Sequence, residues 1–460
     1  MKLCFAVAVF FYSFLTHSSS TEAKLDKYIS DFKIQALNYP GTKDEKLFKL
    51  GLTLFFEPAL SGNNNISCHD CHSGRGQTGD ALPLGLGEGA DGIADFRQQG
   101  TGAILARHTP QLFNLGFAEI PNLFWDGRVA YHAQGGWFTP EPLLNGPNPK
   151  LKEIASNLNS LLAVQALFPI SNPEEMLGKD SKLDNVTAWQ NAVDRIFKSR
   201  FAKKYQEMFA EAYPGVTKYN IAHVANALAE FQRYQFLAVN TPWDLYLRGR
   251  KELMSERMKR GAVIFFDKGQ CVNCHTGSHL SSFGFQNVMV PHIGPGKTNG
   301  DDLGLAEVTG NPAHIYQFRV PPLRNAGLTP PYMHNGYFKN MWDVVVHYNH
   351  PMRALMHAQW DPRGDARYHE PIYLDTNRER TMQRARSAAP VEKLPRMIGF
   401  SVEEATDLYC FLMVGLTDLS LQQYLIEPGV LNEMDDCDPI IGMRAYDRFS
   451  ATKLHSQKSR

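Results

Sequence analysis

Residues 268–277 read KGQCVNCHTG and residues 66–73 read ISCHDCHS, so the pattern C-x-x-C-H occurs twice in the chain. This pattern is the attachment signature of a c-type haem. Two thiols three residues apart can each form a thioether to a porphyrin vinyl group, and the next imidazole can then bind the iron. The pattern therefore predicts two covalently bound haems c. The candidate attachment and iron-binding residues are Cys68, Cys71, His72, Cys271, Cys274 and His275.

A structural zinc site is the alternative interpretation, because C-x-x-C pairs also bind zinc. A histidine follows both pairs, and the chain begins like an exported protein, which favours haem. Lys2, the apolar run from Leu3 to Leu15 and the small polar residues after it form the layout of a secretory signal. The run of about 13 residues is shorter than the roughly 20 needed to span a membrane. We therefore expect a periplasmic protein with no membrane attachment after signal removal.

The composition limits the partners of the chain. Lys plus Arg and Asp plus Glu number 47 each, so no net charge favours binding to nucleic acid or to an anionic membrane. Apolar residues make up 43%, which is enough for a sizeable core. Cys4 lies in the predicted signal, and four cysteines belong to the haem motifs. Cys410 and Cys437 remain, and an oxidising compartment permits a disulfide between them.

Apolar residues recur at helical spacing in several segments and seldom alternate as they do in strands. Helices are expected over residues 44–56, 188–213, 219–237, 252–266 and 401–416, and another is expected to begin at Asn340. A helix and a loop precede each C-x-x-C-H motif, which indicates a weak internal repeat. The expected fold is mainly α, with two cytochrome c-like haem domains and long irregular loops.

The two motifs and changes in composition predict the domain boundaries. The expected parts are a signal peptide at 1–23, an N-terminal haem domain at 24–240, a C-terminal haem domain at 241–430 and a tail at 431–460. Residues 351–399, rich in Arg and other charged residues, are interpreted as a surface insertion in the second domain. The Gly-rich segment 73–102 is long for a loop in a compact domain and is expected to cover a haem edge.

Several segments, in order, resemble one known family. They are LGLTLFFEPALSGNNNISCHDCH (50–72), RHTPQLFNLG (107–116), FWDGR (124–128), EEM (174–176), KGQCVNCHTG (268–277) and PPLRNAGLTPPYMHNGYF (321–338). Over roughly residues 45–420 the chain is similar to the bacterial di-haem cytochrome c peroxidase and MauG family. The resemblance implies an oxidoreductase that meets hydrogen peroxide at the N-terminal haem and passes electrons through the C-terminal haem.

The resemblance also implies roles for three further residues. Trp125 in FWDGR matches a tryptophan that relays electrons between the haems, although a core aromatic is the alternative. Glu175 in EEM resembles a distal carboxylate that moves protons at the peroxide haem. Its neighbour Glu174, or an ordinary solvated role for Glu175, is the alternative. Tyr348 matches the position of the sixth ligand of the second haem, which is tyrosine in MauG and methionine in the peroxidases. Other candidates for that ligand are Met341, Met352, His347 and His350, and a core role for Tyr348 also stays open.

Two positions depart from the family pattern. Peroxidases that need reductive activation carry a distal histidine in the loop after the first motif, but residues 73–107 contain none. The first haem is therefore expected to be open without prior reduction. The family's calcium site resembles one formed here by Thr329 and Pro331, but His108 stands where the family has an Asn ligand. Because calcium prefers oxygen ligands, a local structural role for His108 is the alternative.

Three functions stay open at this point. The first is a peroxidase that takes electrons from a small redox protein. The second is a MauG-like enzyme that uses an oxidised haem pair to modify a residue, such as tryptophan, of a partner protein. The third is a di-haem electron carrier without catalysis, which would show only low-spin haem and no reaction with peroxide.

Overall fold

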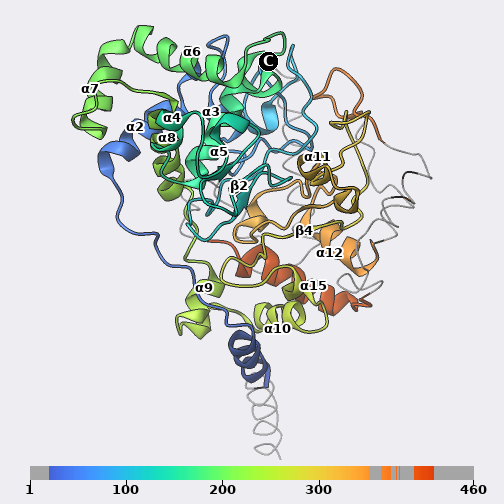
Figure 1. Ribbon diagram of the computed structural model, residues 1–460. Coiled ribbons are helices and arrows are strands. Elements are labelled where there is room, and N and C mark those ends of the chain that lie inside the picture. The colour runs from blue at the N-terminus through green and yellow to red at the C-terminus, as the bar shows by residue number, and fades with distance from the viewer. Residues whose placement is uncertain (1–19, 352–363, 375–379, 381–382, 384–397, 419–460) are drawn as a thin grey trace, which may run out of the picture.

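The computed structural model describes residues 20–351, 364–374, 380, 383 and 398–418. Most of the predicted signal, the whole predicted tail, Met352 and Cys437 lie outside the described residues. Helices and long irregular segments dominate, and strands are few and short (Figure 1). The mainly α fold class is therefore confirmed. Among the described residues, no helix combines the length and the apolar character needed to cross a bilayer.

The first group of helices surrounds the N-terminal motif and lies in the upper part of Figure 1. These helices are α2 (Glu45–Phe55), α3 (Cys68–Cys71), α4 (Lys152–Ala155), α5 (Leu161–Ser171), α6 (Asn185–Lys198), α7 (Ala202–Ala212) and α8 (Ile221–Gln235). Their apolar faces enclose one hydrophobic cluster, in which Leu54, Leu167 and Phe209 are fully buried. With the exception of Phe283, every buried member of this cluster lies between residues 37 and 239.

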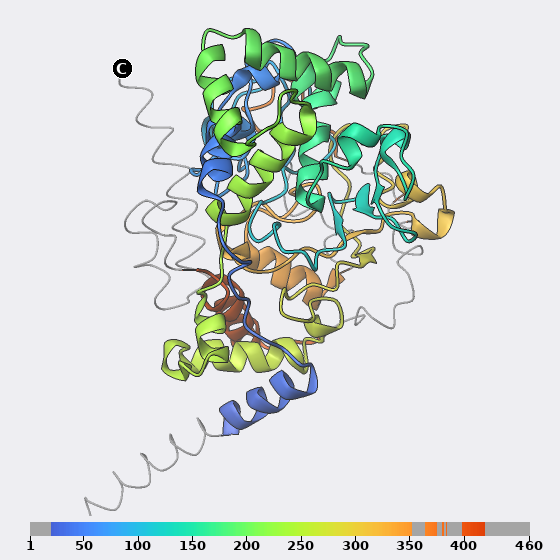
Figure 2. The ribbon, with the colours of Figure 1, turned by 60° about the vertical axis from the view of Figure 1, so that its left-hand side comes forward.

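The second group surrounds the C-terminal motif and occupies the lower part of Figure 1. Its helices are α9 (Pro242–Leu247), α10 (Glu256–Phe266), α12 (Met341–Asn349) and α15 (Val402–Cys410), followed by a π-helical turn at Phe411–Gly415. A separate cluster, which includes Trp243 and Phe411, fills the space between them. Residues 20–31 form a helix that extends from this end of the molecule (Figure 2). Leu25 and Ile34 belong to this second cluster, so the start of the described chain packs with the C-terminal half.

Short strands hold the segments that join the two groups. β1 (Asn122–Leu123), β2 (Val129–Tyr131) and β3 (Trp137–Phe138) form an antiparallel sheet in sequence order. β4 (Phe285–Gln286) pairs antiparallel with β5 (Phe318–Arg319), with Phe285 opposite Arg319. The FWDGR segment therefore turns between β1 and β2, and its Trp125 carbonyl accepts a 2.8 Å hydrogen bond from the backbone N–H of Arg319.

One helix crossing occurs twice. A Cβ on Gly51 of α2 would lie 1.8 Å from the carbonyl oxygen of Ala227 in α8, and one on Gly261 of α10 would lie 1.9 Å from that of Asp407 in α15. Only glycine permits backbones to approach this closely. In both crossings the helix that carries the glycine leads into a C-x-x-C-H motif, which agrees with the expected internal repeat.

Most helix predictions are confirmed, with local corrections. Asn340 and Ser401 cap α12 and α15 as their side chains predict, and Asp44 caps α2. The expected helix over 188–213 is wrong as a single element, because α6 ends at Lys198 and α7 begins at Ala202. The Ser199 hydroxyl accepts a 3.1 Å hydrogen bond from the N–H of Phe201, which satisfies the backbone in a turn. Similarly, Ser255 caps α10, so that helix begins later than expected.

Residues 364–374, within the predicted surface insertion 351–399, are mostly exposed, but three of them are buried. Tyr368 and Ile372 are buried in a third cluster together with Leu82 and Leu86 of the Gly-rich segment. The Tyr368 hydroxyl donates a 2.7 Å hydrogen bond to the carbonyl of Leu84. Charged residues dominate the composition of this stretch, but its few apolar residues decide where it packs.

Candidate haem sites

The first motif begins a short helix whose start is fixed by its own side chains. The Asp70 carboxylate accepts hydrogen bonds from the N–H and the hydroxyl of Ser67, at 2.7 and 2.6 Å. This capping brings Cys68 and Cys71 to one helical turn. His72 follows, and its Nδ1 lies 2.8 Å from the carbonyl oxygen of Thr78. Burial lowers the pKa of this imidazole, which favours the neutral form that binds iron.

The second motif has the same local design. Cys271–Asn273 form a 3-10 turn, and the His275 N–H donates a 2.8 Å hydrogen bond to the Cys271 carbonyl. The Nδ1 of His275 lies 3.0 Å from the carbonyl oxygen of Leu280. Burial lowers the pKa of His275 to about 4. Both motifs therefore present a neutral imidazole whose Nδ1 is engaged by a backbone carbonyl a few residues later.

These residues fit a covalently attached haem. A carbonyl that accepts from Nδ1 fixes the tautomer and orientation of the ring and leaves Nε2 for a metal. None of the four motif cysteines forms a disulfide, as thioether formation requires. Burial raises the thiol pKa of Cys68, Cys71 and Cys271 to about 12. Within the described residues, no group of three or more His, Cys, Asp or Glu side chains could hold a metal ion, so neither motif has the further ligands of a structural zinc site.

Glu175 lies close to the first motif. It belongs to a π-helical turn at Pro173–Leu177, and the Asn172 side chain donates to its Oε1 at 2.7 Å. Burial raises the pKa of the Cys71 thiol, and the charge of the Glu175 carboxylate adds to that rise. Glu174 is exposed, whereas Glu175 is half-buried. Of the two carboxylates, Glu175 is thus the one inside the fold near the motif.

Arg128 connects Glu175 to the FWDGR segment. Its Nη2 lies 3.8 Å from Glu175 Oε1, and its Nη1 lies 3.1 Å from Asp126 Oδ2. The guanidinium also stacks over the Phe124 ring, 3.7 Å from the ring centre. These three contacts restrict Arg128, which therefore holds one oxygen of Glu175 with a fixed positive charge.

Trp125 joins the two halves of the chain. Its indole N–H donates a 2.9 Å hydrogen bond to the carbonyl of His108, and its own carbonyl accepts from Arg319. His108 in turn has its Nδ1 2.7 Å from the carbonyl oxygen of Leu82 and donates its backbone N–H to the His334 carbonyl. His108 therefore has a structural role in holding this junction. The relay role of Trp125 stays a prediction.

The calcium site also stays a prediction. The Thr329 hydroxyl donates to the Ala326 carbonyl at 3.3 Å. Within the described part of the chain, no group of three or more His, Cys, Asp or Glu side chains could hold a metal ion. Pro331 would contribute only its carbonyl oxygen.

Tyr348 lies close to the second motif. It is in the last turn of α12, and its pKa is raised by burial and then by the thiols of Cys274 and Cys271. Its neighbour His347 has Nε2 2.7 Å from the Val288 carbonyl oxygen, which engages that nitrogen elsewhere. Among the candidates for the sixth ligand, Tyr348 is thus one whose pKa the second pair of thiols affects, and Met352 lies outside the described residues. Iron ligation by Tyr348 stays a prediction.

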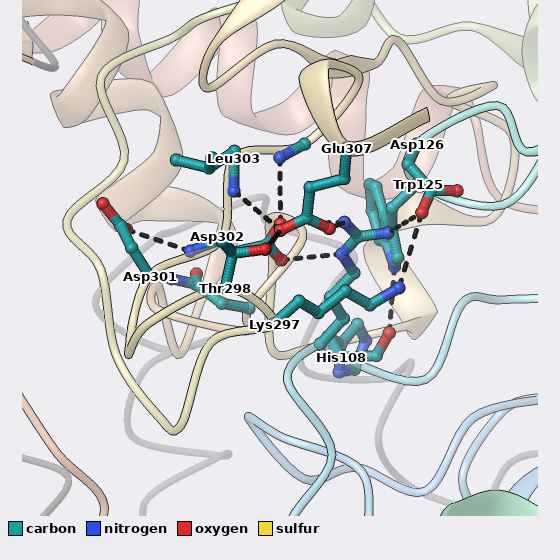
Figure 3. Close-up of polar contacts among 12 residues, drawn as sticks. His108, Trp125, Asp126, Lys297, Thr298, Asp301, Asp302, Leu303 and Glu307 are labelled. Atoms are coloured by element: carbon teal, nitrogen blue, oxygen red, sulfur yellow. Dashed lines mark hydrogen bonds and ion pairs between the residues drawn. The ribbon is translucent and has the colours of Figure 1, made fainter. Parts of the chain in front are cut away.

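A buried ionic cluster between the two halves was not predicted from the sequence (Figure 3). Arg107 forms two hydrogen bonds to Asp302, at 2.7 and 2.8 Å, and contacts Asp126 at 2.5 Å and Glu307 at 3.3 Å. Lys297 lies 3.5 Å from Asp126. Although burial alone would lower the pKa of Arg107, the carboxylates of Asp302 and Asp126 raise it. Charged residues of the RHTP and FWDGR segments thus pair with Lys297, Asp302 and Glu307, which follow the second motif in the sequence.

The disulfide prediction is resolved in part. Cys410 is disulfide-bonded, and its partner is none of the four cysteines of the C-x-x-C-H motifs, because these form no disulfide. The partner is therefore outside the described residues, and pairing with Cys437 stays a prediction.

Comparison with known proteins agrees with the two motifs. Residues 45–252 match the family model of di-haem cytochrome c peroxidase. The chain is 28% identical to the cytochrome c551 peroxidase of Pseudomonas aeruginosa, over 66% of this chain and 71% of that one. It is also 28% identical to the methylamine utilization protein MauG of Methylorubrum extorquens, over 65% of this chain and 67% of that one.

Solved structures show the same fold. A MauG-like protein associated with microbial copper homeostasis superposes with a TM-score of 0.57 at 23% identity, covering 86% of this chain and 95% of that one. The di-haem peroxidase BthA of Burkholderia thailandensis gives 0.56 at 20% identity, with coverages of 84% and 89%. Together with the two C-x-x-C-H motifs, these matches support the di-haem cytochrome c peroxidase and MauG family of oxidoreductases for this chain.

Proposed function

We propose that the chain is an exported, periplasmic oxidoreductase that reacts with hydrogen peroxide at the N-terminal haem and transfers electrons through the C-terminal haem. The observation that carries this proposal is the position of Glu175, a half-buried carboxylate near the first motif held by Asn172 and Arg128. The electron donor would be a small redox protein.

Two haem domains of common design fit the described packing. One hydrophobic cluster contains the helices around the first motif, and another contains those around the second. The repeated glycine crossings of α2 with α8 and of α10 with α15 support a shared cytochrome c-like plan. We therefore propose haem domains at 24–240 and 241–430, with the helix at 20–31 packing against the second.

The haem iron, when bound, supplies the peroxide-binding position and the redox equivalents. Glu175 would take a proton from the bound oxidant at one carboxylate oxygen and return it to the departing oxygen, which is general acid–base catalysis. Its Oε1 is held by Asn172 and Arg128, and its Oε2 has no hydrogen-bond partner among the described residues. We assign proton transfer to Oε2. Trp125, at the junction of the two halves, would relay electrons between the sites.

A MauG-like reaction on a partner protein is the second candidate function. It is favoured by Tyr348, whose phenol lies near the Cys271 and Cys274 thiols. An anionic oxygen ligand would stabilise oxidised iron, whereas a methionine would favour the ferrous state. An oxidised haem pair could then be used to modify a residue such as tryptophan on the partner.

Peroxide kinetics of the holoenzyme test the role of Glu175. We expect Glu175→Gln to slow the reaction with peroxide by about 10²–10⁴-fold, because a positioned proton-transfer group contributes that much. Glu174→Gln is the matched control, since Glu174 is the exposed neighbour, and it should react like the wild type. Equal rates for the two variants would assign no proton transfer to Glu175.

Electron paramagnetic resonance of the as-isolated ferric protein tests the remaining alternatives. We expect one high-spin haem before any reduction, because residues 73–107 contain no histidine to bind the first iron. Two low-spin signals and no reaction with peroxide would instead support an electron carrier. A mixture of the enzyme, peroxide and a reduced small cytochrome then separates the two enzymes. Rapid oxidation of the cytochrome supports the peroxidase, whereas persistence of the oxidised haem pair of the enzyme supports the MauG-like reaction.

A further inference from the structure

Arg319 carries a buried charge without a matching acid. The residue lies in β5 and is only 7% exposed. Its Nε donates to the Phe124 carbonyl at 3.2 Å, but its Nη1 has no hydrogen-bond partner. Among the described residues, no carboxylate lies within ion-pair distance of it. A guanidinium held this way lacks the counter-charge that buried cations need.

In the described part of the chain, two other buried arginines have the acidic partner that Arg319 lacks. Arg324, five residues later, forms hydrogen bonds of 2.9 and 2.6 Å to the two oxygens of Asp244. Arg107 has a similar double contact with Asp302. Burial alone lowers the pKa of Arg319 to about 10, with no acid nearby to oppose it. The protein therefore pairs Arg324 and Arg107 internally and leaves Arg319 for an anion that is not part of the described chain.

The surroundings of Arg319 indicate which anion this is. Its N–H donates to the Trp125 carbonyl, so the residue lies at the junction between the two halves. The next residue, Val320, accepts a 2.6 Å hydrogen bond from the hydroxyl of Ser281, which lies just beyond the second motif. The backbone of Pro321 interacts with the imidazole of His275. The strand that holds Arg319 thus runs along the site of the second haem.

We propose that the Arg319 guanidinium binds a propionate carboxylate of the haem attached at Cys271 and Cys274, and so raises the reduction potential of that haem. This assignment rests on the proposed second haem and not on the peroxide chemistry. A carboxylate and a guanidinium form paired, charge-assisted hydrogen bonds. A fixed positive charge near the ring disfavours the additional positive charge of ferric iron, which raises the potential. Arg319 is a positioning residue, because it would act through the haem carboxylate.

Spectroelectrochemical titration of the holoenzyme tests the proposal. Mass spectrometry first establishes that both haems are attached, so loss of a haem is distinguished from failure of the Arg319 assignment. We expect Arg319→Gln to lower the potential of the C-terminal haem, Arg319→Lys to restore most of it, and the N-terminal haem to stay unchanged. Arg195→Gln is the matched control, because Arg195 also donates to main-chain carbonyls, those of Ala59 and Leu60 in the N-terminal half.

Three outcomes would overturn the proposal. In the first, Arg319→Gln leaves the reduction potential of the C-terminal haem unchanged. In the second, it shifts the potential of the N-terminal haem instead. In the third, the potential of the wild type changes with added phosphate or chloride, which would identify a solution anion as the partner of Arg319. If Arg319→Gln does not fold, resonance Raman spectra of the wild type and Arg319→Lys decide the question. The propionate bending mode of the C-terminal haem should differ between them, and identical modes would reject the contact.

Discussion

At the scale of single residues, local backbone orients the two histidines that are predicted to be proximal haem ligands. Thr78 and Leu280 supply the carbonyl oxygens that engage Nδ1 of His72 and His275, at 2.8 and 3.0 Å. Each carbonyl lies only a few residues beyond its histidine, so the loop directly after the motif orients the ring. The orientation of each imidazole therefore depends little on the packing between the two halves.

The sixth ligand of the second haem gives a prediction at this scale. We expect Tyr348→Phe to change the low-spin spectrum of the C-terminal haem, because the phenylalanine ring keeps the packing but removes the phenol oxygen. The N-terminal haem should keep its spectrum. Tyr131→Phe, at a tyrosine that is 45% exposed in β2, is the control. An unaltered spectrum of Tyr348→Phe would exclude this residue as the ligand.

At the scale of elements, two glycine crossings define how each motif is supported. α2 meets α8 at Gly51, and α10 meets α15 at Gly261, with backbone contacts that leave no room for a side chain. A phenylalanine lies next to the glycine in each crossing: Phe231 of α8 in the first, and Phe411, in the π-helical turn directly after α15, in the second. The close crossing and its aromatic neighbour form the same small unit behind both haem motifs.

The crossings predict the effect of adding one methyl group. We expect Gly51→Ala and Gly261→Ala each to lower the free energy of unfolding by about 1–3 kcal/mol, because overpacking forces the helices apart. Gly364→Ala is the control, since a Cβ there would meet no atom within 4 Å. Thermal and urea unfolding of the holoenzyme measure the three variants. If Gly51→Ala and Gly261→Ala are as stable as Gly364→Ala, the helices can move apart without loss of unfolding free energy.

At the scale of the whole molecule, the buried ionic cluster joins the two halves. Asp302 contacts Arg107 across 195 residues of sequence. Burial tends to raise the pKa of Asp302, but the Arg107 charge outweighs it and lowers that pKa to about 2. The pKa of Glu307, in contrast, is raised by burial and by Asp302. In this cluster the ionised form of Asp302 is therefore favoured and the ionised form of Glu307 is disfavoured. Asp302 and Arg107 form its strongest pair.

The depressed pKa of Asp302 predicts how stability depends on pH. Because the folded-state pKa of about 2 lies below the ordinary value of 3.8, ionised Asp302 stabilises the fold above pH 4. This contribution, about 2 kcal/mol, is lost as the pH falls from about 4 to 2. Asp302→Asn should be less stable at pH 5 and should show a shallower loss of unfolding free energy over that range.

Urea unfolding at pH 5, 4 and 3 measures this dependence. Glu45→Gln serves as the control, because Glu45 is an exposed partner of Lys43 on α2, with its side chain 74% exposed. It should retain the slope of the wild type. A wild-type slope in Asp302→Asn would show that other carboxylates carry the acid dependence.

Much of the structure can be predicted from patterns of residues that lie close together in the sequence. The C-x-x-C-H spacing predicts both haem motifs, and capping residues such as Asp44 and Ser401 mark helix starts, because these effects act within a few residues. The sequence missed α5, whose residues Leu161–Ser171 are buried on almost every side. Such a helix has no polar face, so its apolar residues show no helical period.

The sequence by itself predicted the mainly α class, which the structure confirms, and it indicated the family, the haem attachment residues and the proximal histidines, since each depends on residues close together in the chain. Only the tertiary structure decided that Arg128 reaches Glu175, that Arg107 pairs with Asp302, and that Arg319 is buried without an acid. These contacts depend on how two halves pack. The partner of a charged residue cannot be predicted from the sequence when only the fold brings the two residues close together.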